Sequence, residues 1–93
     1  MTKITMQDLE TIHPYKLTFL LEDAAKEASS EQIVPILLKA LQHKSALVRE
    51  GAVIGLYFHT DALGVKEKVV DISSTDESPG VRETALSIID DSF

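Results

Sequence analysis

Two short stretches of this 93-residue chain repeat each other and decide its fold. Residues 45–52 read SALVREGA, and residues 78–85, placed 33 positions later, read SPGVRETA, so that five of the eight positions are identical. A fixed period of this size is typical of stacked helix pairs, because one pair cannot bury its apolar face alone and therefore packs on its neighbour. The repeat predicts an all-α chain.

Apolar periodicity extends this expectation along the chain from residue 13 onward. Apolar residues recur three and four positions apart, and no stretch alternates over the length of a strand. Residues 1–10 have only a weak pattern, which fits a frayed extension or a short extra turn. Cap and turn residues predict five helices. The first is 14–28, the second follows Ser29 or Ser30 and runs over 31–43, and the third is 46–59. The fourth begins after a cap at Thr60 or Asp61 and ends before a turn at residues 73–77, and the fifth is 79–91.

These helices are expected to stack as a short α-solenoid. Two antiparallel pairs, about 30–59 and 60–91, follow an N-terminal capping helix at about 14–28, and one domain spans 1–93. The turns then fall near residues 29, 44, 60 and 75. Gly55 in the third helix indicates a close approach of a neighbouring helix.

The Val-Arg-x-x-Ala pattern after a polar turn resembles the HEAT repeat, in particular the short repeats of phycobilin lyase-like proteins, over roughly residues 30–91. The resemblance implies that the valine and alanine of each copy are buried on the second helix of a pair. The residues at these positions are Val48, Ala52, Val81 and Ala85.

The same resemblance implies that an arginine near the start of each second helix ties neighbouring turns together through an aspartate in a turn. Arg49 and Arg82 stand at the arginine positions, and Asp76 stands at the aspartate position. His43 holds the equivalent place in the first copy, so the series of contacts is expected to be interrupted there. We expect Asp76 to accept a hydrogen bond from Arg82 or from Arg49.

Composition and charge exclude several classes of function. Nine Lys plus Arg against fifteen Asp plus Glu give a net charge of -6, which disfavours direct binding to nucleic acid or to an anionic membrane. Residues 46–93 carry nine acids and four bases, and therefore most of the excess. The absence of cysteine excludes disulfides and thiolate sites, and fits a reducing compartment. Residues 1–10 lack a secretory apolar run and no span has the length of a membrane helix, so we expect a cytoplasmic protein.

No motif indicates catalysis, a cofactor or a metal. His13, His43 and His59 are not spaced as His-x-x-x-His, and adjacent acids on a helix point to different sides. Glycine-rich phosphate loops and Gly-x-Ser-x-Gly are absent from the sequence. The sequence therefore predicts that the protein is not an enzyme.

A candidate binding surface emerges when the third helix is aligned with the fifth at the 33-residue offset. Ile54, Tyr57 and Phe58 stand where the fifth helix has polar residues. Either the first helix covers them with its leucines and Phe19 as additional core, or they form a docking patch for a partner or a second copy. We expect Ile54 or Tyr57 to be core and Phe58 to be partly exposed. The aligned pairs are Glu50 with Glu83, Ile54 with Ser87, Tyr57 with Asp90, and Phe58 with Asp91.

These features predict a non-catalytic protein-interaction module, a small adaptor or regulator whose partner has a basic rim. Two alternatives remain open: an accessory protein that handles a small ligand or chromophore, and an acidic mimic of nucleic acid. A homodimer is also compatible with the pattern. The residues expected to bind the partner are Glu50, Ile54, Tyr57, Phe58, Glu83, Ser87, Asp90 and Asp91.

Overall fold

The computed structural model describes residues 3–93, and all the regular structure in this range is helical. The all-α prediction is therefore confirmed. Residues 1 and 2, which belong to the expected domain, lie outside the described range. The α-helices are α1 (Asp8–Thr11), α2 (Pro14–Glu27), α3 (Ser30–Ala40), α4 (Ala46–Leu56), α5 (Val65–Thr75) and α6 (Pro79–Ser92), and a 3-10 helix η1 (Tyr57–His59) follows α4.

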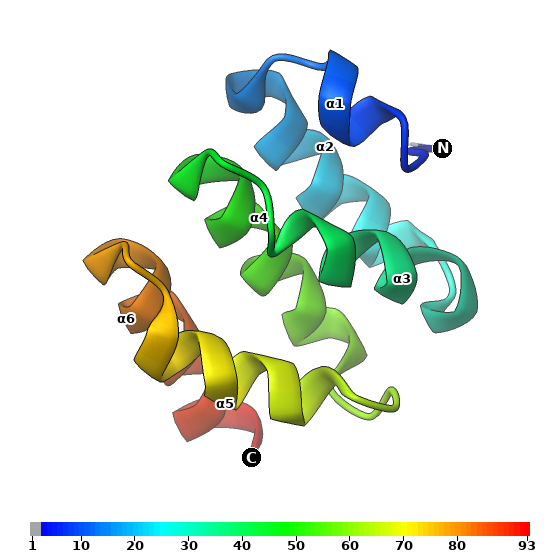
Figure 1. The fold of residues 1–93 in the computed structure, drawn as a ribbon. Helices are drawn as coiled ribbons and strands as arrows, with labels where there is room; N and C mark the ends of the chain where they lie inside the picture. Colours follow the sequence, from blue (N-terminus) through cyan, green and yellow to red (C-terminus); the bar gives the residue numbers. More distant parts are fainter. Residues whose placement is uncertain (1–2) are drawn as a thin grey trace.

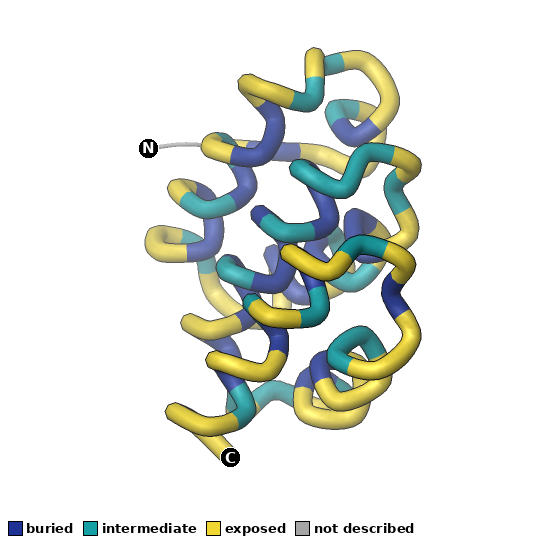
Figure 2. Tube along the Cα trace, turned by 90° about the vertical axis from the view of Figure 1, so that its left-hand side faces the viewer, coloured by how far each residue is buried: buried dark blue, intermediate teal, exposed yellow. Residues whose placement is uncertain are grey.

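The helices lie in two layers. Helices α2, α4 and α6 run side by side in one layer, while α1, α3 and α5 lie in the other (Figure 1). Helix α4 is central, because it packs against α2, α3 and α6. The buried stretches of the chain line the space between the layers, and the exposed stretches lie outside (Figure 2).

Helix α4 is central because its sequence is apolar or small on almost every side. Val48, Ala52, Val53 and Leu56 are 0% exposed. Such a helix is stable only when neighbours cover it on several sides. The other large side chains that are at most 1% exposed come from four other helices: Leu17 and Leu21 of α2, Leu37 of α3, Val65 and Val69 of α5, and Val81 of α6.

Two glycines of α4 allow its neighbours to approach closely. A Cβ on Gly51 would clash with the hydroxyl of Thr18 on α2 and lie 3.0 Å from the Thr18 carbonyl oxygen. A Cβ on Gly55 would lie 2.9 Å from Leu37 Cδ2 and 3.1 Å from Ala25 Cβ. The expected close approach at Gly55 is confirmed, and Gly51 serves the crossing of α2 over α4 in the same way. At that crossing the Thr18 hydroxyl donates to the Leu47 carbonyl at 2.9 Å.

The helix boundaries differ from the expected ones at several places, and α4 ends at Leu56, where the 3-10 helix η1 begins, rather than at residue 59. Helix α5 begins at Val65, not after Thr60 or Asp61, because Gly64 precedes it with φ +85, a left-handed conformation that a residue with a Cβ rarely adopts. Residues 73–75 belong to α5 rather than to a turn, and the backbone N–H of Asp76 donates to the Ile72 carbonyl at 3.2 Å at the end of this helix. Helix α3 ends at Ala40, before the expected residue 43.

The N-terminal segment forms an extra turn that packs on the domain. Helix α1 is four residues long, and Leu9 within it is buried. The Thr5 backbone N–H donates to Asp8 Oδ2 at 2.8 Å and holds the start of this turn. In the described part of the chain, no helix has the length and apolar character that crossing a membrane requires.

Replacing Gly51 with alanine is expected to destabilise the protein by about 1 to 3 kcal/mol, because the added methyl group meets the backbone of Thr18 and α2 must shift. Gly80→Ala is the matched control. Its Cβ would meet only Ser78 Oγ at 3.8 Å, so this change is expected to be neutral or stabilising by up to about 1 kcal/mol. Thermal and urea unfolding of the two variants measure the difference. Equal stability of the two would contradict a close crossing at Gly51.

Candidate functional site

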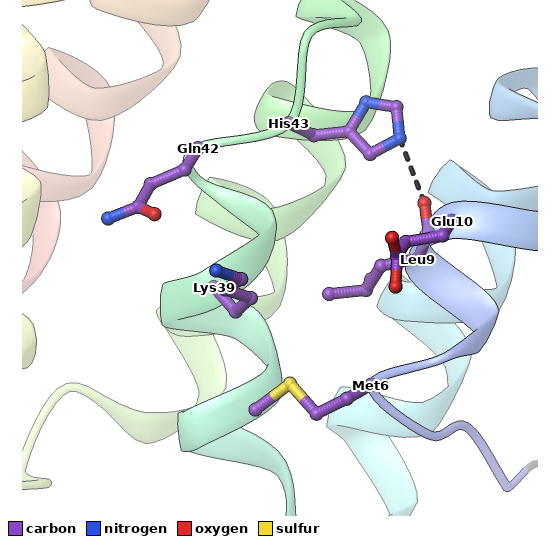
Figure 3. A pocket seen from close by; sticks show the side chains of 6 residues that line it. All are labelled: Met6, Leu9, Glu10, Lys39, Gln42 and His43. Atoms are coloured by element: carbon purple, nitrogen blue, oxygen red, sulfur yellow. Dashed lines mark hydrogen bonds between the residues drawn. The ribbon is translucent and has the colours of Figure 1, made fainter.

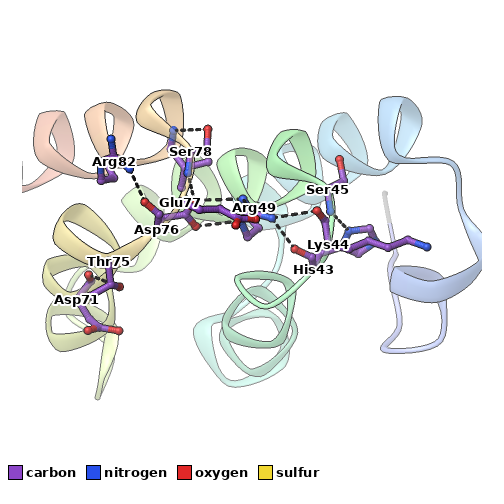
Figure 4. Close-up of polar contacts among 11 residues, drawn as sticks. His43, Lys44, Ser45, Arg49, Asp71, Thr75, Asp76, Glu77, Ser78 and Arg82 are labelled. Carbon is purple, nitrogen blue, oxygen red and sulfur yellow. Dashed lines mark hydrogen bonds and ion pairs between the residues drawn. The ribbon is translucent and has the colours of Figure 1, made fainter.

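Arg49, near the start of α4, and Asp76, in the turn between α5 and α6, form a buried ion pair (Figure 4). Arg49 Nε donates to Asp76 Oδ2 at 2.9 Å, and Nη2 donates to Oδ1 at 3.1 Å. The two side chains are 8% and 4% exposed. Two parallel charge-assisted bonds in a sheltered place fix both distance and orientation, which one bond does not.

The same guanidinium also binds the turn between α3 and α4. Its Nη1 donates to the carbonyl oxygens of His43 at 2.9 Å and Lys44 at 3.1 Å. Arg49 therefore joins the α3–α4 turn to the α5–α6 turn. The Glu77 Oε1 atom lies 3.8 Å from Arg49 Nη2, but the Glu77 side chain is largely exposed, so this ion pair contributes little to stability.

Arg82 makes the corresponding backbone contact in the second copy. Its Nη1 donates to the Asp76 carbonyl at 2.6 Å, just as Arg49 donates to the carbonyl six residues before itself. Of the two arginines expected to reach the Asp76 carboxylate, Arg49 does so, and Arg82 binds the backbone instead.

The environment of Asp76 lowers its pKa. Burial alone raises the pKa of this carboxyl group, but hydrogen bonds from Arg49 and from the Ser78 N–H, with the positive charges of Arg49 and Arg82, outweigh it. The carboxylate therefore titrates below its usual value of 3.8. Every strong contact of the Asp76 side chain stabilises its ionised form.

His43 replaces aspartate in the first copy and keeps the turn intact. Its Nδ1 accepts a hydrogen bond from the Ser45 N–H at 3.0 Å, as Asp76 Oδ1 accepts one from the Ser78 N–H at 2.9 Å. Its Nε2 lies 3.0 Å from the Leu9 carbonyl oxygen, which only accepts, so Nε2 carries the proton. The interruption expected at His43 is thus limited to the arginine contact, and the imidazole ties α1 to the domain instead.

The residues expected to bind a partner lie on the exposed side of α4 and α6, and α2 adjoins them. Glu50 accepts a hydrogen bond from the Thr84 hydroxyl at 2.8 Å, and the Tyr57 hydroxyl donates to Asp91 Oδ2 at 2.7 Å. These bonds bring the two helices' polar residues together. We call this surface the acidic face: Glu22, Lys26, Glu50, Ile54, Tyr57, Phe58, Glu83, Ser87, Asp90 and Asp91.

Within the acidic face, Glu83, Ser87, Asp90 and Asp91 are all exposed on α6. Glu83, Ser87 and Asp90 are four and three residues apart, which places them along one side of the helix, and Asp91 lies next to them on the side that faces Tyr57. The Ser87 hydroxyl donates to the Glu83 carbonyl, and the Ser87 side chain is exposed to solvent.

Two aromatic rings form the apolar part of this face. Tyr57 is 42% exposed and Phe58 is 44% exposed, and their rings meet edge to face at 5.5 Å. The Lys26 ammonium lies 5.9 Å from the centre of the Phe58 ring, within the range of a cation–π contact. The partial exposure expected for Phe58 is confirmed, and Ile54 is half-buried.

Of Ile54 and Tyr57, one of which is expected to be core, Tyr57 is exposed and Ile54 is half-buried. Tyr57 follows Glu50 and Ile54 at spacings of seven and three residues, so it lies on the same partly exposed side of the chain. His59 is buried instead: its Nε2 bonds to the Ala25 carbonyl at 2.8 Å and its Nδ1 to Ser30 Oγ at 2.7 Å. Helix α2 does not cover the rings with Phe19 either, because Phe19 is 61% exposed.

Two groups of the acidic face have raised pKa values. The hydrogen bond to Asp91, together with the charge of that carboxylate, raises the pKa of Tyr57 above 10.0. Burial raises the pKa of Glu22 above 4.5, with added repulsion from Asp23 and Glu50 that Lys26 partly offsets. Both shifts favour the protonated forms of these two groups.

A cleft between α1 and α3 is a feature that sequence reasoning missed. It has a volume of about 470 Å³, and His43 closes one end through its bond to the Leu9 carbonyl (Figure 3). Its only signal in the sequence is the weak apolar pattern near the N-terminus. The lining residues are Met6, Leu9, Glu10, Lys39, Gln42 and His43.

The described residues contain no group of three or more histidine or acidic side chains able to hold a metal ion. Comparison with models of protein families, with curated proteins and with solved structures gave no match to this chain.

Replacing Asp76 with alanine is expected to cost about 3 to 5 kcal/mol, because the change leaves a buried guanidinium without its carboxylate. Asp71→Ala is the control: Asp71 is exposed and its side chain makes no hydrogen bond with a described residue, so the change should cost less than about 0.5 kcal/mol. Chemical unfolding compares the two. A loss below about 1 kcal/mol for Asp76→Ala would show that solvent reaches the pair.

The lowered pKa of Asp76 predicts a loss of stability in acid. The folded state binds this proton more weakly than the unfolded state, so the contribution is complete above pH 3.8 and falls as the pH drops through the folded pKa. Asp76→Asn lacks this titration. The stability difference between the native protein and this variant should therefore shrink below about pH 4 in unfolding experiments. A constant difference across that range would contradict the assignment.

Proposed function

We propose that this protein is a non-catalytic protein-binding module built as a short α-solenoid of the HEAT type. The repeats are about 30–59 and 60–91, and the N-terminal helices cap them. Support comes from the layer that α2, α4 and α6 form, and from the matching contacts of Arg49 and Arg82 with the carbonyls six residues before them.

The observation that carries the proposal is the exposed aromatic pair on the acidic face. Tyr57 and Phe58 leave more than two fifths of their surface in water, while carboxylates of α6 stand beside them. Exposed aromatics that polar groups surround are typical of the centre of a protein interface. Because the face is acidic, the partner it fits has an apolar centre and a basic rim.

The polar pairs of this face support a binding role over a catalytic one. Glu50 is held by Thr84 and Asp91 by Tyr57, so these carboxylates are engaged in contacts between helices. A rigid, prearranged surface loses little entropy when a partner binds.

The cleft between α1 and α3 favours a second candidate, the binding of a small ligand. Its apolar residues Met6 and Leu9 lie beside charged Glu10 and Lys39 (Figure 3), a combination that suits an amphipathic molecule. The third interpretation, an acidic mimic of nucleic acid, has less support because Lys26 and the two rings interrupt the carboxylates.

The proposal predicts opposite effects of Phe58→Ser on stability and on binding. Because the ring is 44% exposed, its loss should lower the free energy of unfolding by only about 1 kcal/mol. Capture of partners from a cell extract by the tagged protein should fall about tenfold or more. Ile54→Ser is expected to weaken capture too, with a larger loss of stability, because Ile54 is half-buried.

Leu63→Ser is the control, since Leu63 is 98% exposed and lies outside the acidic face. This variant should keep both its melting temperature and its partners. A loss of about 3 to 5 kcal/mol in Phe58→Ser would identify the ring as core, and unchanged capture would remove it from the interface.

A further inference from the structure

The outer side of α6, at the end of the layer, exposes an apolar stripe that is distinct from the aromatic pair of the acidic face. Arg82, Leu86, Ile89 and Phe93 follow one another at spacings of four, three and four, the pattern of a helix face that packs on another helix. Leu86 is 48% exposed and Phe93 is 39% exposed. Val70 of the adjacent α5 is 44% exposed, and Lys66 of α5 lies 5.9 Å from the centre of the Phe93 ring.

The equivalent positions of α4 show what such a stripe does when it is covered. At the 33-residue offset, Leu86 corresponds to Val53 and Ile89 to Leu56, and both α4 residues are 0% exposed. Val53 lies one turn after Arg49, on the side of α4 that reaches Asp76. The outer side of α6 thus exposes apolar residues at positions that are fully buried in α4.

The charged groups on this stripe are also incompletely paired. Arg49 uses Nε and Nη2 to bind a carboxylate, but these nitrogens of Arg82 have no acceptor among residues 3–93. Asp90 is exposed, and within the same range its carboxylate has no hydrogen-bond or ion-pair partner. One cation and one anion are therefore available on the same side of α6.

The two charges are placed symmetrically about an apolar centre. Arg82 stands four residues before Leu86 and Asp90 four residues after it, so each lies about one helical turn away. When two identical helices of this kind pair in antiparallel orientation about Leu86, each arginine meets the aspartate of the other helix. A two-fold symmetric interface requires a self-complementary surface, in which each residue contacts the residue that contacts it in the other copy.

We propose that this stripe binds a second copy of the chain, with α6 packed antiparallel against α6 of the copy. Leu86 lies at the two-fold axis, Ile89 and Phe93 extend the apolar contact, and two Arg82–Asp90 pairs flank it. The interface supplies Arg82 with the carboxylate that Arg49 finds inside the domain. This surface does not involve Tyr57 or Phe58 and shares only Asp90 with the acidic face, so variants of Phe58 and of Leu86 distinguish the two proposals.

Sedimentation equilibrium over a wide range of protein concentration tests the dimer. The native protein should associate reversibly, and Leu86→Ser should be monomeric with a nearly unchanged melting temperature, since Leu86 is half exposed. Asp90→Arg places like charges opposite each other and should raise the dimer dissociation constant about tenfold or more. A native protein that is monomeric at every concentration would overturn the proposal.

A mixing experiment tests the pairing itself. Arg82→Asp and Asp90→Arg should each associate weakly alone, but a mixture of the two places opposite charges at both ends and should restore association as a heterodimer. A circular dichroism spectrum shows whether Arg82→Asp folds. If it does not, three separate variants replace it: Arg82→Gln, Leu86→Ser and Asp90→Arg, each of which should weaken self-association. Dimers that all of these variants leave intact would refute the proposal.

Phe58→Ser separates this interface from the proposed partner site. It should dimerise like the native protein even where it loses partner capture. Loss of the dimer in Phe58→Ser, with Leu86→Ser unaffected, would assign self-association to the acidic face and contradict the α6 pairing.

Discussion

The buried pair of Arg49 and Asp76 is the contact on which the arrangement of the helices depends. Apolar side chains allow neighbouring helices to slide by small amounts, whereas a guanidinium with four acceptors allows one register only. Burying both charges is costly, and the hydrogen bonds on Arg49 and Asp76 offset that cost together. With α4 and α6 held in this register, Glu50 faces Thr84 and Tyr57 faces Asp91. The acidic face is thus a consequence of the turn contact.

The turn contacts differ at the two ends of the domain, and this difference accounts for the cleft at α1 and for the exposed stripe on α6. At one end His43 takes the aspartate's place, and its second nitrogen binds the Leu9 carbonyl, which brings α1 against the domain and forms the cleft. At the other end Arg82 has the carbonyl contact of Arg49 without its carboxylate. The same repeat position is therefore complete inside the domain and incomplete at α6, where the apolar stripe is exposed.

Much of this could be predicted from the sequence, because the repeat and the helix caps are local signals. They indicate an all-α chain, which is confirmed, and they indicate a contact of Arg49 or Arg82 with Asp76, which Arg49 makes. The failures involve contacts between residues far apart in the chain. The 3-10 helix at residues 57–59, which shortens α4, is one such case, because within it His59 bonds to Ala25 and Ser30 of other helices. The role of His43 depended equally on Leu9, 34 residues away.

The adjacent acids Asp90 and Asp91 illustrate how one helix serves two surfaces. Neighbouring residues on a helix are separated by about 100° around its axis, because 3.6 residues complete a turn. Asp91 therefore points toward α4 and accepts the Tyr57 hydroxyl, whereas Asp90 shares the outer side of α6 with Leu86. A partner on the acidic face and a second copy on the outer stripe would occupy neighbouring sides of α6 that meet at Asp90. In such an assembly two acidic faces lie on either side of one dimer axis, and a partner with two basic sites gains from their linkage.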